Sequence, residues 1–271
     1  MHSEIEVRLK GEVDLNSEGE EGLSTGDKNI DDFLNLSRNS VTLIFGPAFV
    51  GKTTLGLSLS LTEVSRGNRV LYVDTESGVF IRRIRALCRA RGVDYPLLKE
   101  RFKLLKLYEL KDVLDILDYS LKYNFDLVVL DSLSRPFLKE LHAPTLSELK
   151  EKYDTLSSEV YFKIADFLRD SQDKGSSLII ISEIRLPSKE EKKEFYLLPL
   201  PFPQLSTIAK NAIGIFMRDG RRFMYVERHA FQPSIYEKPV LLEFTITDRG
   251  VKYLGLAEIS KDKIYHHVPI Y

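Results

Sequence analysis

The residues with the clearest chemical potential form a run at positions 46–54 that matches G-x-x-x-x-G-K-[ST]. In such a run, backbone N–H groups at the start of a helix cradle phosphate oxygens, the lysine reaches the terminal phosphates and the next hydroxyl ligates Mg²⁺. The pattern therefore predicts a phosphate-binding loop. Its residues are Gly46, Pro47, Ala48, Phe49, Val50, Gly51, Lys52, Thr53 and Thr54.

Two acids end short apolar runs elsewhere in the chain. Asp131 follows residues 127–130, and Glu76 closes the run 70–76. Mg²⁺ keeps several waters and takes one or two carboxylates, so we expect Asp131 to hold the metal, through a water. Hydrolysis also needs a group that positions water. From the residues alone, Glu76 is either that group or a solvated loop acid.

Short apolar runs alternate with amphipathic stretches in the first two thirds of the chain. Continuous runs of this length indicate strands that are buried on both faces of a parallel sheet. The predicted fold is therefore α/β, a doubly wound, mostly parallel sheet flanked by helices. The strands are expected at 41–45, 70–73, 127–130 and 178–181, and helices at 53–66 and 147–173.

The two ends of the chain differ from this pattern in their composition and in the elements they predict. Residues 1–35 hold ten acids and three bases, which predicts a peripheral strand and then a solvated loop. Antiparallel strands are expected near the C-terminus, with Asp219-Gly220 as a hairpin turn. These strands are predicted at 213–218, 222–228 and 241–247.

Composition excludes several classes of protein. With 39 Lys+Arg against 40 Asp+Glu the net charge is −1, which excludes a uniformly basic protein that coats nucleic acid. The single cysteine, Cys88, excludes an internal disulfide framework. The first residues are too charged for a signal peptide, and the longest uncharged run, 195–209, is too short to span a bilayer. We expect a cytoplasmic protein without a membrane anchor.

The order of these motifs resembles the RecA/RadA/KaiC superfamily of ATPases, most closely its archaeal RadA and RadB branch. The resemblance covers about residues 20–255. It includes the phosphate-binding loop and the segments 23–34, 72–76, 131–134 and 244–251. It implies an ATP- and Mg²⁺-dependent ATPase that assists DNA recombination or repair, with Glu76 and Lys52 catalytic. On this reading, residues 1–22 are an acidic N-terminal segment, 23–256 the RecA-like core and 257–271 a tail.

Two departures from the family set this sequence apart. The chain has only about twenty residues before the match, where RadA-type recombinases carry a helix-hairpin-helix domain, so short-core paralogues are the closer analogy. Ser182-Glu183 stand where the family has an Asn-Gln pair that senses the terminal phosphate. An added negative charge there disfavours binding or slows turnover unless a cation offsets it. A weakly hydrolysing, nucleotide-binding scaffold is therefore an alternative.

The basic residues suggest partners. By position, residues 185–222 resemble the family's second DNA-binding loop, so single- or double-stranded DNA is one expected partner; a lid or protein-docking segment is the alternative. The candidate DNA contacts are Lys189, Lys192, Lys193, Lys210, Arg221 and Arg222. By the resemblance, a RadA-type recombinase or another repair protein is a second expected partner.

Two further sites raise the question of self-association. Arg228 is either a strand-end charge or a contact to the ATP of a neighbouring subunit in a homo-oligomer. Arginines at 82, 85 and 89 share one face of a helix, either as a solvated surface or as a phosphate or subunit contact. A KaiC-like regulatory ATPase that acts on protein partners without DNA is a further alternative.

Overall fold

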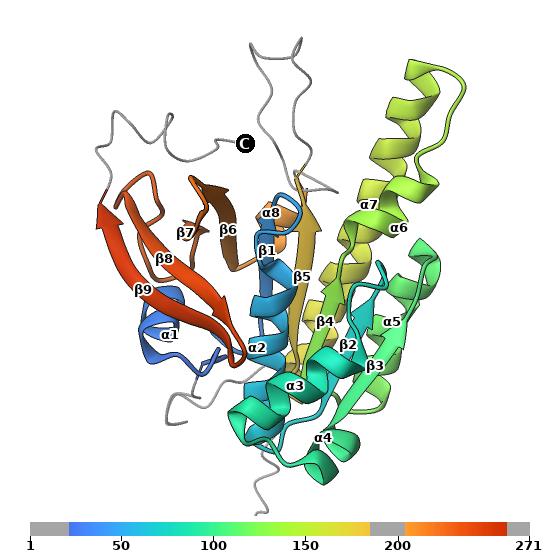
Figure 1. Ribbon diagram of the computed structural model, residues 1–271. Coiled ribbons are helices and arrows are strands. Elements are labelled where there is room, and N and C mark those ends of the chain that lie inside the picture. The colour runs from blue at the N-terminus through green and yellow to red at the C-terminus, as the bar shows by residue number, and fades with distance from the viewer. Residues whose placement is uncertain (1–21, 185–203, 259–271) are drawn as a thin grey trace, which may run out of the picture.

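The computed structural model describes residues 22–184 and 204–258, which share one sheet of nine strands (Figure 1). Its order is β3-β2-β4-β5-β1-β6-β7-β8-β9. The strands from β3 to β6 are parallel to one another, and β7, β8 and β9 follow as antiparallel neighbours. The predicted α/β fold is confirmed. The strands are β1 (Val41–Gly46), β2 (Val70–Asp74), β3 (Phe102–Lys106), β4 (Leu127–Asp131), β5 (Ser177–Glu183), β6 (Asn211–Arg218), β7 (Arg221–Arg228), β8 (Val240–Thr247) and β9 (Gly250–Glu258).

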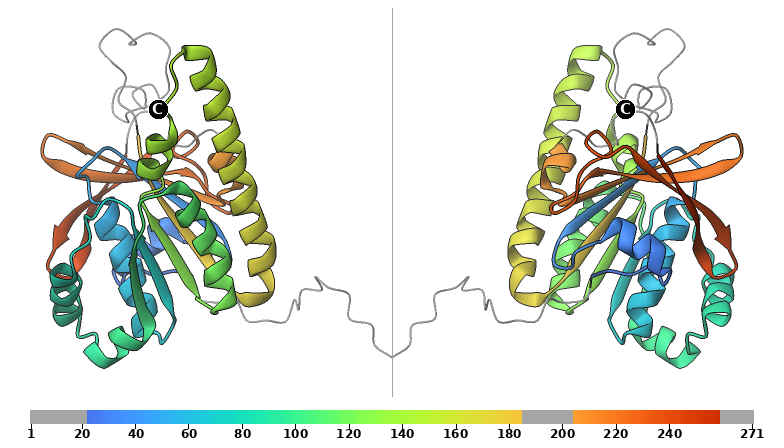
Figure 2. Two further views of the ribbon diagram at one scale, coloured as in Figure 1. Left: turned by 90° about the vertical axis from the view of Figure 1, so that its right-hand side faces the viewer. Right: turned by 90° about the vertical axis from the view of Figure 1, so that its left-hand side faces the viewer.

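Helices cover both faces of this sheet (Figure 2). One face packs against α5 (Leu110–Lys122), α6 (Ser134–Glu140), α7 (Leu146–Ser171) and α8 (Gln204–Ile208), and the short 3₁₀ turn η1 (Gln172–Lys174) follows α7. The other face packs against α1 (Lys28–Leu34), α2 (Lys52–Ser65), α3 (Ile81–Arg91) and α4 (Tyr95–Arg101).

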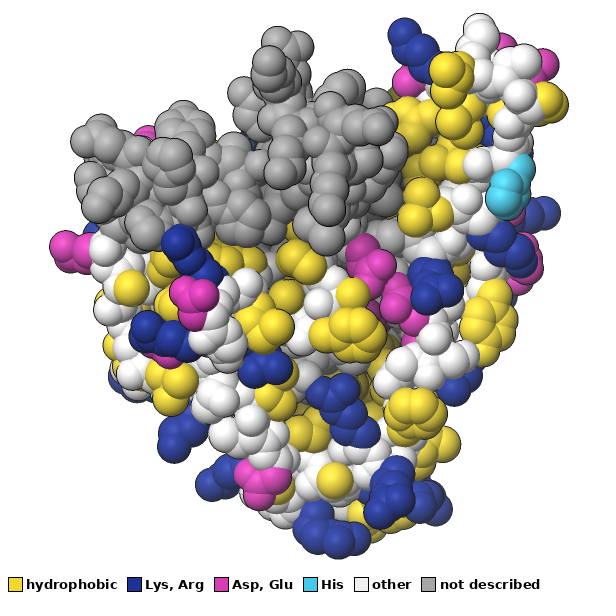
Figure 3. Space-filling model, turned by 45° about the horizontal axis from the view of Figure 1, so that its top comes forward, with side chains coloured by type: hydrophobic (Ala, Val, Ile, Leu, Met, Phe, Trp, Pro, Cys, Tyr) yellow, Lys and Arg dark blue, Asp and Glu magenta, His cyan; other side chains and the backbone are white. Residues whose placement is uncertain are grey.

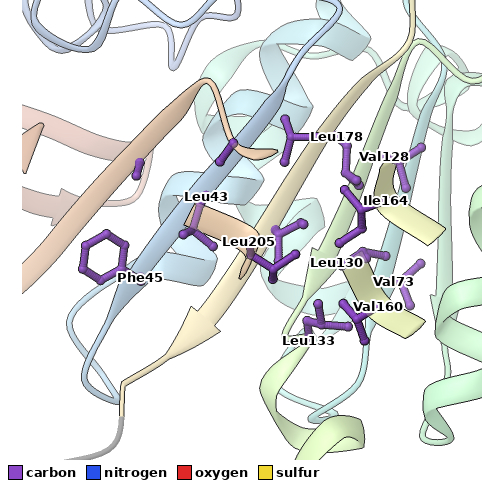
Figure 4. Close-up of a cluster of buried hydrophobic side chains, with 14 of the residues drawn as sticks. Leu43, Phe45, Val73, Val128, Leu130, Leu133, Val160, Ile164, Leu178 and Leu205 are labelled. Carbon is purple, nitrogen blue, oxygen red and sulfur yellow. The ribbon is translucent and has the colours of Figure 1, made fainter. Parts of the chain in front are cut away.

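Alternation of side chains along the strands builds a separate core on each face. In β1, Leu43 and Phe45 belong to the core under α7, whereas Ile44 belongs to the core under α2. Figure 4 shows Leu43 with Val160 and Ile164 of α7 in the first of these cores. Since both faces are covered, every residue of β1, β2 and β4 is buried, which is why their sequences read as unbroken apolar runs.

The predicted long helix and the seven strands predicted between residues 41 and 247 are present, whereas the peripheral strand predicted near the N-terminus lies outside the described residues. One prediction was wrong. Residues 28–34 are not loop: they form α1, because the Asp27 carboxylate caps the helix and Ile30 and Leu34 bury one side of it. In α3, Ile84, Leu87 and Cys88 are buried, whereas Ile81 is 60% exposed.

Two strands at the sheet edges were not predicted. The edge strand β3 pairs only with β2 and is only partly buried, so its sequence carries a weak pattern. The segment 244–251, which resembles a closing strand of the family, spans the end of β8, a turn and the start of β9. Within the two described ranges, none of the helices could cross a membrane, and Cys88 is a buried free thiol.

A buried carboxylate ties the start of β1 to α2. Glu63 is 0% exposed and accepts hydrogen bonds from Arg38 at 2.6 Å, Arg66 at 3.0 Å and Asn68 at 2.6 Å. Removal of one partner from such a network leaves buried charge without compensation. This carboxylate therefore fixes the loop before β1 and the loop after α2 to the last turn of that helix.

Glu63→Ala is expected to lower the free energy of unfolding by about 3–5 kcal/mol, the usual cost of breaking a buried ion pair. Denaturant unfolding followed by circular dichroism measures this change. Glu159→Ala, on the exposed side of α7, is the matched control and should change stability by less than about 0.5 kcal/mol. Equal effects of the two substitutions would contradict the structural role of Glu63.

Candidate nucleotide site

The carboxyl ends of four neighbouring strands, β2, β4, β5 and β1, form the edge of the sheet that carries the predicted site. Parallel pairing aligns Asp74 of β2 with Asp131 of β4, and Gly46 of β1 with Glu183 of β5. Residues that are far apart in the chain therefore meet at this edge, where open α/β sheets bind ligands. In Figure 3 the acidic side chains near the centre of the view contrast with the Lys and Arg side chains below them.

The loop between β1 and α2 is shaped to receive phosphate. Gly46 begins it with φ +156°, and a Cβ there would lie 2.0 Å from the carbonyl oxygen of Ile215 in β6, so no larger residue fits. Gly51 is the N-cap of α2, and no side chain caps its first turn. The first N–H groups of a helix have no partner within the helix, and they are suited to an anion.

Lys52 is 7% exposed and lies among three carboxylates. Its ammonium donates hydrogen bonds to the backbone carbonyl oxygens of Gly46 at 2.9 Å and Pro47 at 2.6 Å. Burial lowers the pKa of Lys52, while the nearby charges of Glu183, Asp131 and Glu76 act in the opposite direction. The lysine therefore stands at the point where the loop and the strand ends converge.

The predicted metal ligands contact each other. The Asp131 carboxylate is 5% exposed and accepts hydrogen bonds from the hydroxyls of Tyr72, at 2.5 Å, and Thr53. Burial raises the pKa of Asp131 to about 6, and the charges of Glu76 and Asp74 add to that rise, whereas the two hydrogen bonds oppose it. A hydroxyl and a carboxylate side by side supply the oxygen ligands that Mg²⁺ prefers, so the residues fit this metal.

Glu76 is held beside Asp131 by the residue that follows Asp131. The Ser132 hydroxyl donates a hydrogen bond to the Glu76 carboxylate at 2.6 Å. The Thr75 hydroxyl donates to the Ser132 carbonyl oxygen at 2.6 Å, and the Glu76 N–H donates to Asp74 at 3.1 Å. These contacts join the ends of β2 and β4 and orient Glu76 toward the other acids.

Ser182 and Glu183, the candidate sensor pair, end β5 next to the loop. The buried Ser182 hydroxyl lies 3.1 Å from the Ser134 hydroxyl, and the Glu183 N–H donates to Ser134 at 2.8 Å. Of the carboxylates near Lys52, Glu183 raises the pKa of this lysine the most. The acid of this pair is therefore part of the site.

Sequence reasoning missed Arg83. Its guanidinium donates a hydrogen bond to the Thr54 hydroxyl and adds a positive charge near the buried Tyr72. The available signal was its spacing, because Arg83 precedes the buried Leu87 by four residues and so lies on the inner side of α3.

The other predicted residues are spread over the molecule. Lys210 lies at the amino-terminal end of β6, where its N–H donates to the Val41 carbonyl oxygen. Arg221 and Arg222 lie at the opposite end of that hairpin, and Arg221 pairs with Glu243. Arg228 pairs with Ala212 near the amino-terminal end of β6, at the opposite end of the strands from the loop. Lys189, Lys192 and Lys193 are outside the described residues.

Comparisons with known proteins identify related sequences and a related fold. Residues 14–142, which include the loop, Glu76 and Asp131, match the AAA domain family. The crystal structure of the RadB recombinase superposes with a TM-score of 0.65 and 26% identity, covering 86% of this chain and 100% of that one. The chain is RadB-like, with a RecA-like fold.

Relatives that align with most of the chain support the same assignment. "DNA repair and recombination protein RadB" of Thermococcus gammatolerans is 27% identical over 237 residues, which cover 85% of this chain and 98% of that protein. The protein of the same name from Thermococcus sibiricus is 24% identical over 236 residues, with 85% and 94% covered. The resemblance seen in the sequence motifs is thus confirmed, and the RadB-like chain aligns with nearly the full length of both relatives.

Proposed function

We propose that this RadB-like chain binds ATP and Mg²⁺ and hydrolyses ATP. Lys52 and the backbone of the loop hold the phosphates, Thr53 and Asp131 hold the metal, the latter through a water, and Glu76 orients the attacking water. Mg²⁺, when bound, neutralises charge on the phosphates. The observation that carries the proposal is the meeting of Lys52, the Thr53–Asp131 pair and the Ser132–Glu76 pair at one sheet edge.

We further propose that the ATPase assists DNA recombination or repair by binding DNA, a RadA-type recombinase, or both. The support is the name shared by the relatives of this chain. Candidate contacts to DNA are Lys189, Lys192, Lys193, Lys210, Arg221 and Arg222, and Arg228 is the candidate contact to a neighbouring subunit. Arg221 already forms an ion pair with Glu243, which a DNA phosphate would have to displace.

The deciding experiment is the steady-state rate of ATP hydrolysis with Mg²⁺, measured with and without single-stranded DNA. We expect hydrolysis that requires Mg²⁺ and responds to DNA. A hydrolysis rate that DNA does not change, together with no DNA binding at low salt, would favour a regulatory ATPase that acts on protein partners. Nucleotide binding without hydrolysis would favour the scaffold alternative, which the position of Glu183 beside Lys52 supports.

Glu183→Gln is expected to tighten ATP binding about tenfold or more, because a carboxylate near the phosphates opposes them by several kcal/mol at contact distance. Titration of the protein with a fluorescent ATP analogue measures the change in Kd. Glu159→Gln, an exposed acid on α7, removes the same charge far from the site and should leave Kd unchanged. An unchanged Kd for Glu183→Gln would remove this residue from the phosphate environment.

A further inference from the structure

A second polar cavity lies at the far end of α2 from the phosphate-binding loop. Its volume is about 520 Å³, and the walls come from the start of α1, the last turns of α2, the end of α3 and the β8–β9 hairpin. Lys52 and Ser65 are separated by about 20 Å at 1.5 Å per helical residue, so the two sites do not overlap. The lining residues are Gly26, Asp27, Thr62, Ser65, Arg91, Thr247, Arg249, Val251 and Lys252.

Three basic side chains and one acid line this cavity. The acid is already engaged, because the Asp27 carboxylate accepts hydrogen bonds from the N–H groups of Asn29 at 3.1 Å and Ile30 at 3.3 Å, and from that of Tyr253 at 3.0 Å. Within residues 22–184 and 204–258, no ion pair joins a carboxylate to any of the three basic residues. The cavity therefore carries an excess of positive charge.

Arg91 places part of that charge in a partly buried position. Its guanidinium donates hydrogen bonds to the carbonyl oxygens of Ser58, at 2.8 Å, and Thr25, and these oxygens carry no net charge. Burial lowers the pKa of Arg91 and the neighbouring guanidinium of Arg249 lowers it further, while Cys88 and the carboxylate of Asp31 act in the opposite direction. Two like charges in the wall of one cavity repel, and an anion bound near both removes that cost.

The hairpin that carries Arg249 and Lys252 is fixed in place. Gly250 has φ +107°, and a Cβ there would lie 2.3 Å from the Ser58 hydroxyl, so only glycine allows the hairpin to approach α2 this closely. The Val251 N–H donates to that hydroxyl at 3.3 Å. Because Tyr253 is bonded to Asp27 as well, the two basic side chains extend from a rigid support.

A row of exposed arginines leads away from the cavity. Arg82, Arg85 and Arg89 of α3 are exposed and lie on one face of the helix, and α3 holds no acid. Figures 1 and 2 both show the tip of the β8–β9 hairpin beside α3. Lys and Arg side chains also gather in the lower part of Figure 3, where Figure 1 places α3 and α4.

We infer that this cavity is a phosphate-binding site, distinct from the nucleotide site, and that Arg91, Arg249 and Lys252 bind the phosphate group. Guanidinium groups bind phosphate through paired, charge-assisted hydrogen bonds. The row of arginines on α3 favours a backbone phosphate of a nucleic acid over a small phosphate compound. This inference does not depend on ATP hydrolysis, because its residues lie outside the loop and the acid cluster.

The test is the double substitution Arg249→Gln with Lys252→Gln, which leaves Arg91 and its hydrogen bonds to the backbone unchanged. Binding of a fluorescein-labelled single-stranded oligonucleotide is followed by anisotropy from 50 to 300 mM salt, without nucleotide or Mg²⁺. Loss of two phosphate contacts should reduce the slope of log K against log salt by about 1.4 and weaken binding at 0.1 M salt about ten- to thirtyfold.

The control is Lys111→Gln with Lys238→Gln, which removes the same charge at two exposed positions outside the cavity. Equal thermal unfolding midpoints of the two double variants show that both are folded. Equal oligonucleotide affinity and equal salt slope for the two would overturn the nucleic-acid assignment.

A second measurement tests whether the ligand is a small phosphate compound. Binding of inorganic pyrophosphate is measured by calorimetry in the Lys52→Ala protein, in which the main phosphate contact of the nucleotide site is removed, with and without the cavity substitutions. Loss of pyrophosphate binding with unchanged oligonucleotide binding supports the phosphate site and assigns it to a small ligand. If neither ligand responds to the cavity substitutions, the inference is wrong.

Discussion

Glu76→Gln is expected to keep ATP binding and to lose about 10²–10⁴-fold in turnover, the usual contribution of a positioned acid–base group. Glutamine keeps the size of the side chain but cannot accept a proton from water. The Ser132 hydroxyl, 2.6 Å from the carboxylate, can still bond to the amide oxygen, so the geometry should survive. Steady-state phosphate release and equilibrium binding of a fluorescent ATP analogue measure the two effects separately.

The hydrogen bond between Ser132 and Glu76 allows a sharper test. Ser132→Ala should lower turnover in the wild-type background because it frees the carboxylate, and it should have little further effect once Glu76 is glutamine. Such non-additivity identifies residues that act as a unit. Glu159→Gln on α7 is the charge-matched control. Steady-state turnover that is unchanged by Glu76→Gln would remove Glu76 from the mechanism.

Lys52→Ala is expected to abolish nucleotide binding or to reduce hydrolysis by at least about 10²–10³-fold, the range seen when one charge-stabilising donor is removed from an active site. The reason is the balance of charge around the loop. The negative charges of Glu183, Asp131 and Glu76 all interact with the charge of Lys52. Removal of the lysine therefore leaves three carboxylates near the triphosphate. Repulsion then replaces attraction where the phosphates would lie.

Calorimetric titration with Mg²⁺ and ATP measures this loss, and thermal unfolding checks the fold, because Lys52 is buried and bonded to the loop carbonyl oxygens. Lys111→Ala, an exposed lysine on α5, is the control and should bind ATP like the wild type. Normal ATP turnover by Lys52→Ala would contradict the assignment of the whole site.

The central strands could be predicted because each is covered on both faces. Burial of every residue of β1, β2 and β4 requires an unbroken apolar run. The edge strand β3 is only partly buried and escaped prediction for that reason. In α1, the decisive contacts of Asp27 include one to Tyr253 of β9, which no local pattern contains.

The sequence by itself determined the chemistry of the predicted nucleotide site. The spacing of Gly46, Gly51, Lys52 and Thr53 is local, since a loop that cradles phosphate is made from consecutive residues. The acids at the ends of two apolar runs could be identified for a related reason, because parallel strands end at one edge of the sheet.

Only the tertiary structure decided which charges meet. Lys52 and Glu183 are neighbours because β1 pairs with β5 across more than a hundred residues. Arg91 and Arg249 line one cavity because the β8–β9 hairpin packs on α2. The net charge of −1 does not predict either contact. Electrostatic interaction depends on distance and burial, and both are set by strand order and packing between segments that the chain keeps far apart.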